Sequence, residues 1–292
     1  MMDYGVFKNV IAERIKEFLP SVYSEFDVNV MEVPKINGMR EAMILEFESD
    51  GCRMSGPNIY LDDFYNAFSE CRDLDEIMQD IAEVIMEFTG TQHFGKDREV
   101  KLDEYKEYVV QMLINTGMNR ELLKSAPHKE LLDLSLIYRL AIPDAGGFAT
   151  ALITYEMMDD MGLTIEELDE LAEENSRRNL PTQLFRMGPE LTMMTTEAKM
   201  YGAINLLRTD ELKKLSDEMN ANLYLLPSSV HDLMALRDSK YSNENSLFEM
   251  LESGNDKCND ADENLSYNIY YYDREKEAVE VKYGKIVKKA QL

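Results

Sequence analysis

Residues 222–236 read NLYLLPSSVHDLMAL and place two short apolar runs on either side of a polar turn. Runs of this length are too short for two independent helices but suit two β-strands. Proline is tolerated at a bend, because no ladder hydrogen bond is needed there from its missing N–H. The pattern predicts two sheet strands joined by a bend at Pro227–Ser229. We expect four apolar side chains of this stretch in the core: Leu223, Leu225, Val230 and Leu233.

The same turn gathers residue types that occur in hydrolytic sites: Ser228, Ser229, His231 and Asp232. A nucleophilic serine needs its hydroxyl within reach of an imidazole, and a carboxylate to orient that ring. On a strand, His231 and Asp232 would point to opposite faces, whereas Ser229 and His231 would share one. Neither serine lies in a G-x-S-x-G elbow. The stretch favours a structural turn, and a hydrolase using Ser229 and His231 is the alternative.

Helix and strand patterns alternate irregularly around this stretch. Strand patterns precede it at residues 105–115, 131–142 and 147–155 and around Met193, and a helical pattern runs from about Gly202 through Met219. A helix at 246–253 and a hairpin at 268–283 follow it. Tyr270, Tyr271 and Tyr272 alternate along the first strand of that hairpin. We therefore expect at least one face of this strand to be exposed or covered by a partner.

The clearest helix start in the chain lies at Thr164. The segment GLTIEELDELAEENSRR places Glu167 three residues after Thr164, which is the spacing of a capping box. Leu163 and Leu168 occupy the positions of a hydrophobic staple. Between Glu156 and Glu174 there are only acidic charged side chains. We expect the later ones to form a solvated face of the helix.

The first part of the chain has another order of elements. A helical pattern covers residues 3–18, a hairpin pattern turns at Asn37–Gly38, and a further helix begins near Asp73. A polar, glycine-containing segment at 90–99 predicts a domain boundary. We expect an N-terminal domain at 1–92, a C-terminal domain at 93–281 and a basic tail at 282–292.

This order of elements is typical of the α+β class. We expect a mixed or antiparallel sheet covered by helices on one face. A smaller helix–hairpin–helix domain should precede it at the N-terminus.

Charge limits the classes of function. The chain has 292 residues, with 56 Asp and Glu against 31 Lys and Arg, and its formal net charge is −25. Such a surface repels phosphates, so direct nucleic-acid binding is disfavoured. No apolar run reaches the length of a membrane span, and no signal-peptide pattern begins the chain. With three widely spaced cysteines, these features predict a cytoplasmic protein with free thiols.

Metal and cofactor motifs are missing from the sequence. His93, His128 and His231 are too far apart to form a spaced ligand pattern. Acidic pairs such as Asp62–Asp63 lack the D-x-D-x-D-G spacing of a calcium loop. The glycines at 146–147 lack the spacing of a phosphate loop. The sequence therefore predicts no metal and no cofactor.

Seven phrases of the chain form a distinctive set. They are FLPSVY (18–23), KINGM (35–39), IYLDDFY (59–65), APHKELLDLSLIYRL (126–140), LTIEELDELAEENSRRNLP (163–181), MYGAINLLRTDELKKL (200–215) and NLYLLPSSVHDLMAL (222–236). Together they resemble a bacterial family known as domain of unknown function 5688. The resemblance extends from about residue 5 to residue 281 and is specific as a set. It implies one integrated chain and supplies no activity, ligand or catalytic residue.

Three hypotheses about function follow. The first is a non-enzymatic interaction or regulatory protein that contacts another protein through an acidic surface with many methionines and tyrosines. The second is the hydrolase with Ser229 and His231. The third is an acidic decoy that binds nucleic-acid-binding proteins by presenting carboxylates in place of phosphates. The sequence carries no pattern that specifies an oligomeric state.

Overall fold

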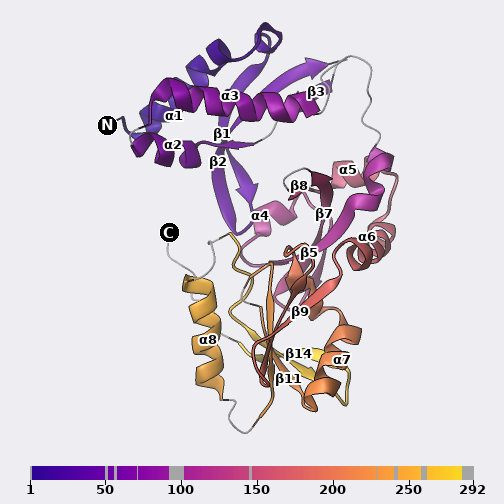
Figure 1. Ribbon diagram of the computed structural model, residues 1–292. Coiled ribbons are helices and arrows are strands. Elements are labelled where there is room, and N and C mark those ends of the chain that lie inside the picture. The colour runs from indigo at the N-terminus through magenta and orange to yellow at the C-terminus, as the bar shows by residue number, and fades with distance from the viewer. Residues whose placement is uncertain are drawn as a thin grey trace. The chain divides into compact units, whose positions relative to one another are not determined.

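The computed structural model describes residues 2–49, 52–55, 58–70, 72–91, 102–144, 147–227, 229–239, 243–257 and 262–284 (Figure 1). Contacts divide the chain into two compact units. The first consists of Met1–Lys35 and Met39–Val100, and the second of Ile36–Gly38 and Lys101–Leu292. The expected boundary at 92/93 lies outside the described residues. Of the expected basic tail at 282–292, the structure describes Lys282 and Tyr283, which end the last strand, and Gly284. Residues 285–292 lie outside the described residues.

The first unit contains three α-helices and a small sheet. Helix α1 begins after Asp3, whose carboxylate accepts the backbone N–H of Val6 at 3.0 Å. Asn37, in the turn between the first two strands, has a left-handed φ of 64°. The sheet order is β1-β2-β3, with β4 also paired to β2. The bounds are α1 Tyr4–Arg14, β1 Asp27–Lys35, β2 Gly38–Ser49, β3 Cys52–Ser55, β4 Ile59–Tyr60, α2 Leu61–Ser69 and α3 Leu74–Thr91.

The second unit contains two antiparallel sheets. A four-stranded sheet has the order β5-β7-β6, with β8 also paired to β7. A six-stranded sheet has the order β14-β13-β11-β12-β10-β9. The strands are β5 Val109–Asn115, β6 His128–Leu131, β7 Leu134–Asp144, β8 Gly147–Leu152, β9 Thr182–Arg186, β10 Leu191–Thr196, β11 Leu223–Leu226, β12 Leu233–Arg237, β13 Ile269–Asp273 and β14 Ala278–Tyr283.

Among the described residues of this unit, five α-helices and two 3-10 helices, η3 at Leu102–Tyr108 and η4, accompany these sheets. The others are α4 Arg120–Leu123, α5 Tyr155–Asp160, α6 Ile165–Asn179, η4 Gly202–Leu206, α7 Thr209–Met219 and α8 Glu244–Lys257. The α+β class is confirmed, and the sheets are antiparallel. No helix among the described residues is both long and apolar enough to cross a membrane.

The six-stranded sheet is covered on both faces, so the prediction of helices on one face is wrong. Leu212 and Leu215 of α7 belong to the same core as Leu223 and Leu225 of β11. On the opposite face, Leu247 and Leu251 of α8 pack with Tyr224, Leu226 and Tyr271. Figure 1 shows α7 and α8 on either side of this sheet. The side chains of β11 therefore alternate between two apolar cores.

The three consecutive tyrosines of β13 are all buried. Tyr270 and Tyr272 lie in the core beneath α7, and Tyr271 lies in the core beneath α8. The expectation of an exposed or partner-covered face is therefore wrong. The chain covers both faces of this strand with its own helices.

The start of α6 is the capping box that the sequence predicts. The Thr164 hydroxyl accepts the Glu167 N–H at 3.2 Å, and the Glu167 carboxylate accepts the Thr164 N–H at 2.9 Å. The N–H and hydroxyl of Thr164 lower the pKa of the Glu167 carboxyl, because both stabilise its charged form. Two backbone donors at the helix start are thereby satisfied.

Replacing Thr164 by Ala is expected to lower the free energy of unfolding by about 1 kcal/mol, because the Glu167 N–H loses its side-chain acceptor. Urea titration followed by far-UV circular dichroism measures this change. Thr164→Ser retains the hydroxyl and is the control. Equal stability of the Ala variant and the parent chain would show that the cap contributes nothing.

Candidate functional site

The bend between β11 and β12 has the predicted position, but Ser228 lies outside the described residues. Leu223, Leu225, Val230 and Leu233 are buried, as the sequence predicts. Ser229 is 2% exposed, and its hydroxyl oxygen accepts the backbone N–H groups of His231 and Asp232, both at 3.0 Å. These bonds close the turn in the manner of an ST-turn.

The His231 ring is held by other groups. Its Nδ1 accepts the backbone N–H of Tyr201 at 3.2 Å, and its Nε2 lies 3.6 Å from Glu263 Oε1. Among the described residues, no hydrogen bond joins this ring to the Ser229 hydroxyl. Strand β12 begins at Leu233, so the expectation that His231 and Asp232 lie on a strand is wrong. Ser229 and His231 therefore do not form a hydrogen-bonded dyad in this conformation.

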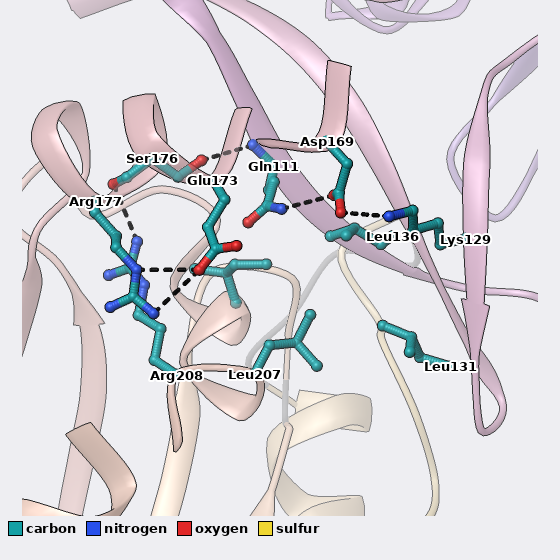
Figure 2. Close-up of a pocket in the computed structure, with 11 residues that line it drawn as sticks. Gln111, Lys129, Leu131, Leu136, Asp169, Glu173, Ser176, Arg177, Leu207 and Arg208 are labelled. Atoms are coloured by element: carbon teal, nitrogen blue, oxygen red, sulfur yellow. Dashed lines mark hydrogen bonds and ion pairs between the residues drawn. The ribbon is translucent and has the colours of Figure 1, made fainter. Parts of the chain in front are cut away.

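A cavity of about 260 Å³ lies elsewhere in the second unit (Figure 2). One wall is a face of α6, and strands β5, β6 and β7 and the segment from η4 to Arg208 supply the others. Its volume lies just below the range usual for drug-sized ligands, so it suits a small metabolite. The lining residues are Gln111, Lys129, Leu131, Leu136, Asp169, Glu173, Ser176, Arg177, Ile204, Leu207 and Arg208.

Asp169 fixes one end of the polar wall. Its carboxylate accepts hydrogen bonds from Gln111 Nε2 and the Tyr138 hydroxyl, both at 3.0 Å, and from Lys129 Nζ at 2.5 Å. Burial, and then the charge of Asp169, raises the pKa of Tyr138, so the phenol stays protonated and donates. Because Nε2 of Gln111 is bound to Asp169, its side-chain oxygen is directed into the cavity, toward Glu173 (Figure 2).

Glu173 and Arg177 follow Asp169 at four-residue steps along α6. Arg177 donates to Glu173 Oε1 through Nε and Nη2, each at 3.3 Å, and to Asp210 through Nη1. Both bonds to Glu173 use the same oxygen. Its second oxygen accepts no hydrogen bond from the described residues, and the carboxylate faces the cavity (Figure 2).

Arg208 is the buried cation of the site. It is 5% exposed and donates to Leu180 O at 3.0 Å, Thr182 Oγ1 at 2.9 Å and Ser176 O at 3.0 Å. It forms no ion pair with a carboxylate among the described residues. Burial, and then the neighbouring Arg177 charge, lowers the pKa of this guanidinium. The carbonyls at the C-terminus of α6 offset its charge only in part.

The remaining wall is aliphatic and is formed by Leu131, Leu136, Ile204 and Leu207. Leu131 is 36% exposed, so the cavity borders solvent there. The site combines a hydrocarbon surface with adjacent hydrogen-bond acceptors and arginines. Such a surface complements a small molecule with an aliphatic body and a zwitterionic end.

Sequence reasoning assigned none of these residues to a site. The available pattern was the i, i+4, i+8 series of Asp169, Glu173 and Arg177, which share a helix face. Within the described part of the chain, no three His, Cys, Asp or Glu side chains form a group that could hold a metal ion.

Comparison with known protein families gives a match over most of the chain. The model of a Family of unknown function (DUF5688) matches residues 4–197 and 189–274. No curated protein and no solved structure matches the chain. These matches supply no activity for the cavity.

Proposed function

The chain belongs to the Family of unknown function (DUF5688), and we propose that it is a non-enzymatic regulatory protein that binds a small aliphatic amino acid in the α6 cavity. One observation carries the proposal: the free oxygens of Gln111 and Glu173 and the guanidinium groups of Arg177 and Arg208 border one space beside an aliphatic wall. We also propose that the N-terminal helices and hairpin form a separate small domain and that the protein acts in the cytoplasm.

The ammonium group of the ligand would lie between the Gln111 amide oxygen and the Glu173 carboxylate. Both are acceptors, and Glu173 adds a negative charge. A neutral hydroxyl would gain less from these contacts, because hydrogen bonds to ionised groups are the stronger ones.

The ligand carboxylate would lie on the side of Arg177 and Arg208. Arg208 uses its two Nη atoms for the bonds to Leu180, Thr182 and Ser176, and its Nε–H has no acceptor among the described residues. Leu131, Leu136 and Leu207 would contact the aliphatic side chain. Burial of a leucine-sized side chain contributes about 2 kcal/mol, which makes the hydrocarbon part a determinant of affinity.

The non-enzymatic part of the proposal rests on the Ser229 turn. The Ser229 hydroxyl is buried and accepts two backbone N–H groups, which is a structural role. The carboxylate of Asp169 is held by hydrogen bonds from Gln111, Tyr138 and Lys129. The pKa of the Tyr138 phenol is raised, so this group does not act as a general base near neutral pH.

Isothermal titration calorimetry tests the proposal with L-leucine as the probe. We expect 4-methylpentanoate, which lacks the ammonium, and 3-methylbutylamine, which lacks the carboxylate, each to bind at least about tenfold more weakly, because each loses charge-assisted hydrogen bonds. Absence of heat from L-leucine at millimolar concentration would refute the amino-acid assignment. Equal affinity for all three compounds would refute the two charged subsites.

A matched pair of variants identifies the site. Glu173→Gln is expected to weaken L-leucine about tenfold and to leave 4-methylpentanoate unchanged, because only the ammonium contact loses charge. Glu190→Gln is the matched control. The Glu190 side chain is 51% exposed and lies 3.3 Å from Arg237, and the Glu173 side chain is 54% exposed and lies 3.3 Å from Arg177. Equal losses in the two variants would place the ligand elsewhere.

A further inference from the structure

The outer edge of β8 carries backbone groups that no described strand pairs. The register sets Leu140 opposite Ala151 and Ala141 opposite Thr150, and the Ile153 N–H donates to Tyr138 O at 3.0 Å. In an antiparallel ladder, residue pairs that exchange backbone hydrogen bonds alternate with pairs that do not. The backbone N–H and C=O groups of Ala149 and Ala151 therefore point toward β7. The N–H and C=O groups of Phe148, Thr150 and Leu152 consequently point away from β7.

This edge is exposed and without charge. Residues 147–151 are all exposed, and Phe148 is 37% exposed. Strand β8 reads GFATAL and contains neither a charged residue nor proline, the usual means of protecting an edge strand. An uncharged strand is notable in a chain of net charge −25, because most other surfaces of two copies would repel each other.

We propose that β8 pairs with β8 of a second copy of this chain in an antiparallel, two-fold arrangement centred on Thr150. The sequence is self-complementary about that residue, because Phe148 then lies opposite Leu152 of the second copy and Thr150 opposite its equivalent. Each of these pairs exchanges two backbone hydrogen bonds. The apolar pair and the central threonine pair are both favourable cross-strand combinations.

The two-fold arrangement closes on itself, so it yields a dimer and not a fibre. It joins the two four-stranded sheets into one continuous sheet and pairs the β8 edge of each copy (Figure 1 shows β8 beside β7). Strand β8 itself brings no like charges into register, and the charge beside the axis in each copy is Arg139 of β7, which donates to the Thr150 hydroxyl at 3.0 Å. The proposal does not depend on the ligand of the α6 cavity.

Sedimentation velocity of the full chain across the micromolar range tests the pairing. We expect a concentration-dependent dimer in the parent chain. Thr150→Lys should raise the dissociation constant at least about tenfold, because two ammonium groups meet on the two-fold axis. Thr150→Pro should abolish the dimer while leaving the β7–β8 ladder intact, since the N–H that it removes points outward.

Ala278→Lys is the control for the added charge, because Ala278 is exposed on β14, an edge strand of the other sheet. It should dimerise like the parent chain. Circular dichroism checks that each variant is folded. A parent chain that stays monomeric at all concentrations, or a dimer that survives Thr150→Pro, would overturn the proposal.

Discussion

Replacing Gly202 by Ala is expected to lower the free energy of unfolding by about 3 kcal/mol, the upper end of the cost of overpacking a core. A Cβ at Gly202 would lie 2.2 Å from His231 O and 2.5 Å from Thr195 Cα. Both atoms belong to the backbone, so no side-chain rotation relieves the contact. The preceding residue, Tyr201, already has a left-handed φ of 55°, which leaves the chain little freedom to move aside.

Gly38→Ala is the matched control, because a Cβ there meets no atom within 4 Å and Gly38 has no left-handed φ. It should change the free energy of unfolding by less than about 1 kcal/mol. Urea titration gives the stabilities, and amide hydrogen exchange shows whether protection is lost in residues 102–284. Similar stabilities for the two variants would show that the backbone around Gly202 shifts without cost.

The same glycine also positions the cavity. Gly202 begins η4, which carries Ile204, and Leu207 and Arg208 follow directly. A shift of η4 away from Thr195 would therefore move one wall of the site. Gly202→Ala should consequently weaken binding of L-leucine as well as stability, and Gly38→Ala should affect neither.

The sequence predicted those features of the fold that are formed by residues close together in the chain. The capping box of Thr164 and Glu167 requires only residues three positions apart, and α6 begins there. The bend after Leu226 likewise follows from short apolar runs around a proline. Strand alternation placed Leu223 and Leu225 on one buried face.

Short sequence patterns do not predict which distant parts of the chain pack against a strand. The tyrosines of β13 alternate as in a half-exposed strand, but α8 covers the face that contains Tyr271. Helix α7 covers the other face. A pattern within five residues does not report which distant helix lies over it. The same limit explains why helices were expected on one face of the sheet.

The candidate site could not be predicted for a related reason. Asp169 and Glu173 lie within an acidic run that is typical of a solvated helix face. Their roles depend on Gln111 and Lys129, which other strands bring to α6. Arg208 resembles an ordinary surface residue before a helix, and only the tertiary fold places α6 carbonyls around it.

Replacing Arg208 by Met is expected to lower the free energy of unfolding by about 2 kcal/mol. Methionine retains most of the aliphatic volume but donates no hydrogen bond. The buried Leu180 O then loses the donor that satisfies it, whereas Ser176 O keeps the Leu180 N–H at 3.0 Å and the Thr182 hydroxyl keeps its bond to Asn205. One unsatisfied buried group costs about 1 to 3 kcal/mol, and removal of the buried charge offsets part of that cost.

Arg186→Met is the control for this substitution. Arg186 lies in the same unit, but its side chain is 41% exposed and its ion pair is with Glu218, whose side chain is 61% exposed. An exposed ion pair contributes less than about 1 kcal/mol, so this variant should remain close to the parent chain. Arg208→Lys should fall between the two, because one ammonium cannot reach all three acceptors in the fork geometry of a guanidinium. If Arg208→Met were as stable as Arg186→Met in urea titration, the guanidinium would contribute no net stability. Its burial beside Arg177 would then serve ligand binding alone, and L-leucine affinity would be the only property that the substitution lowers.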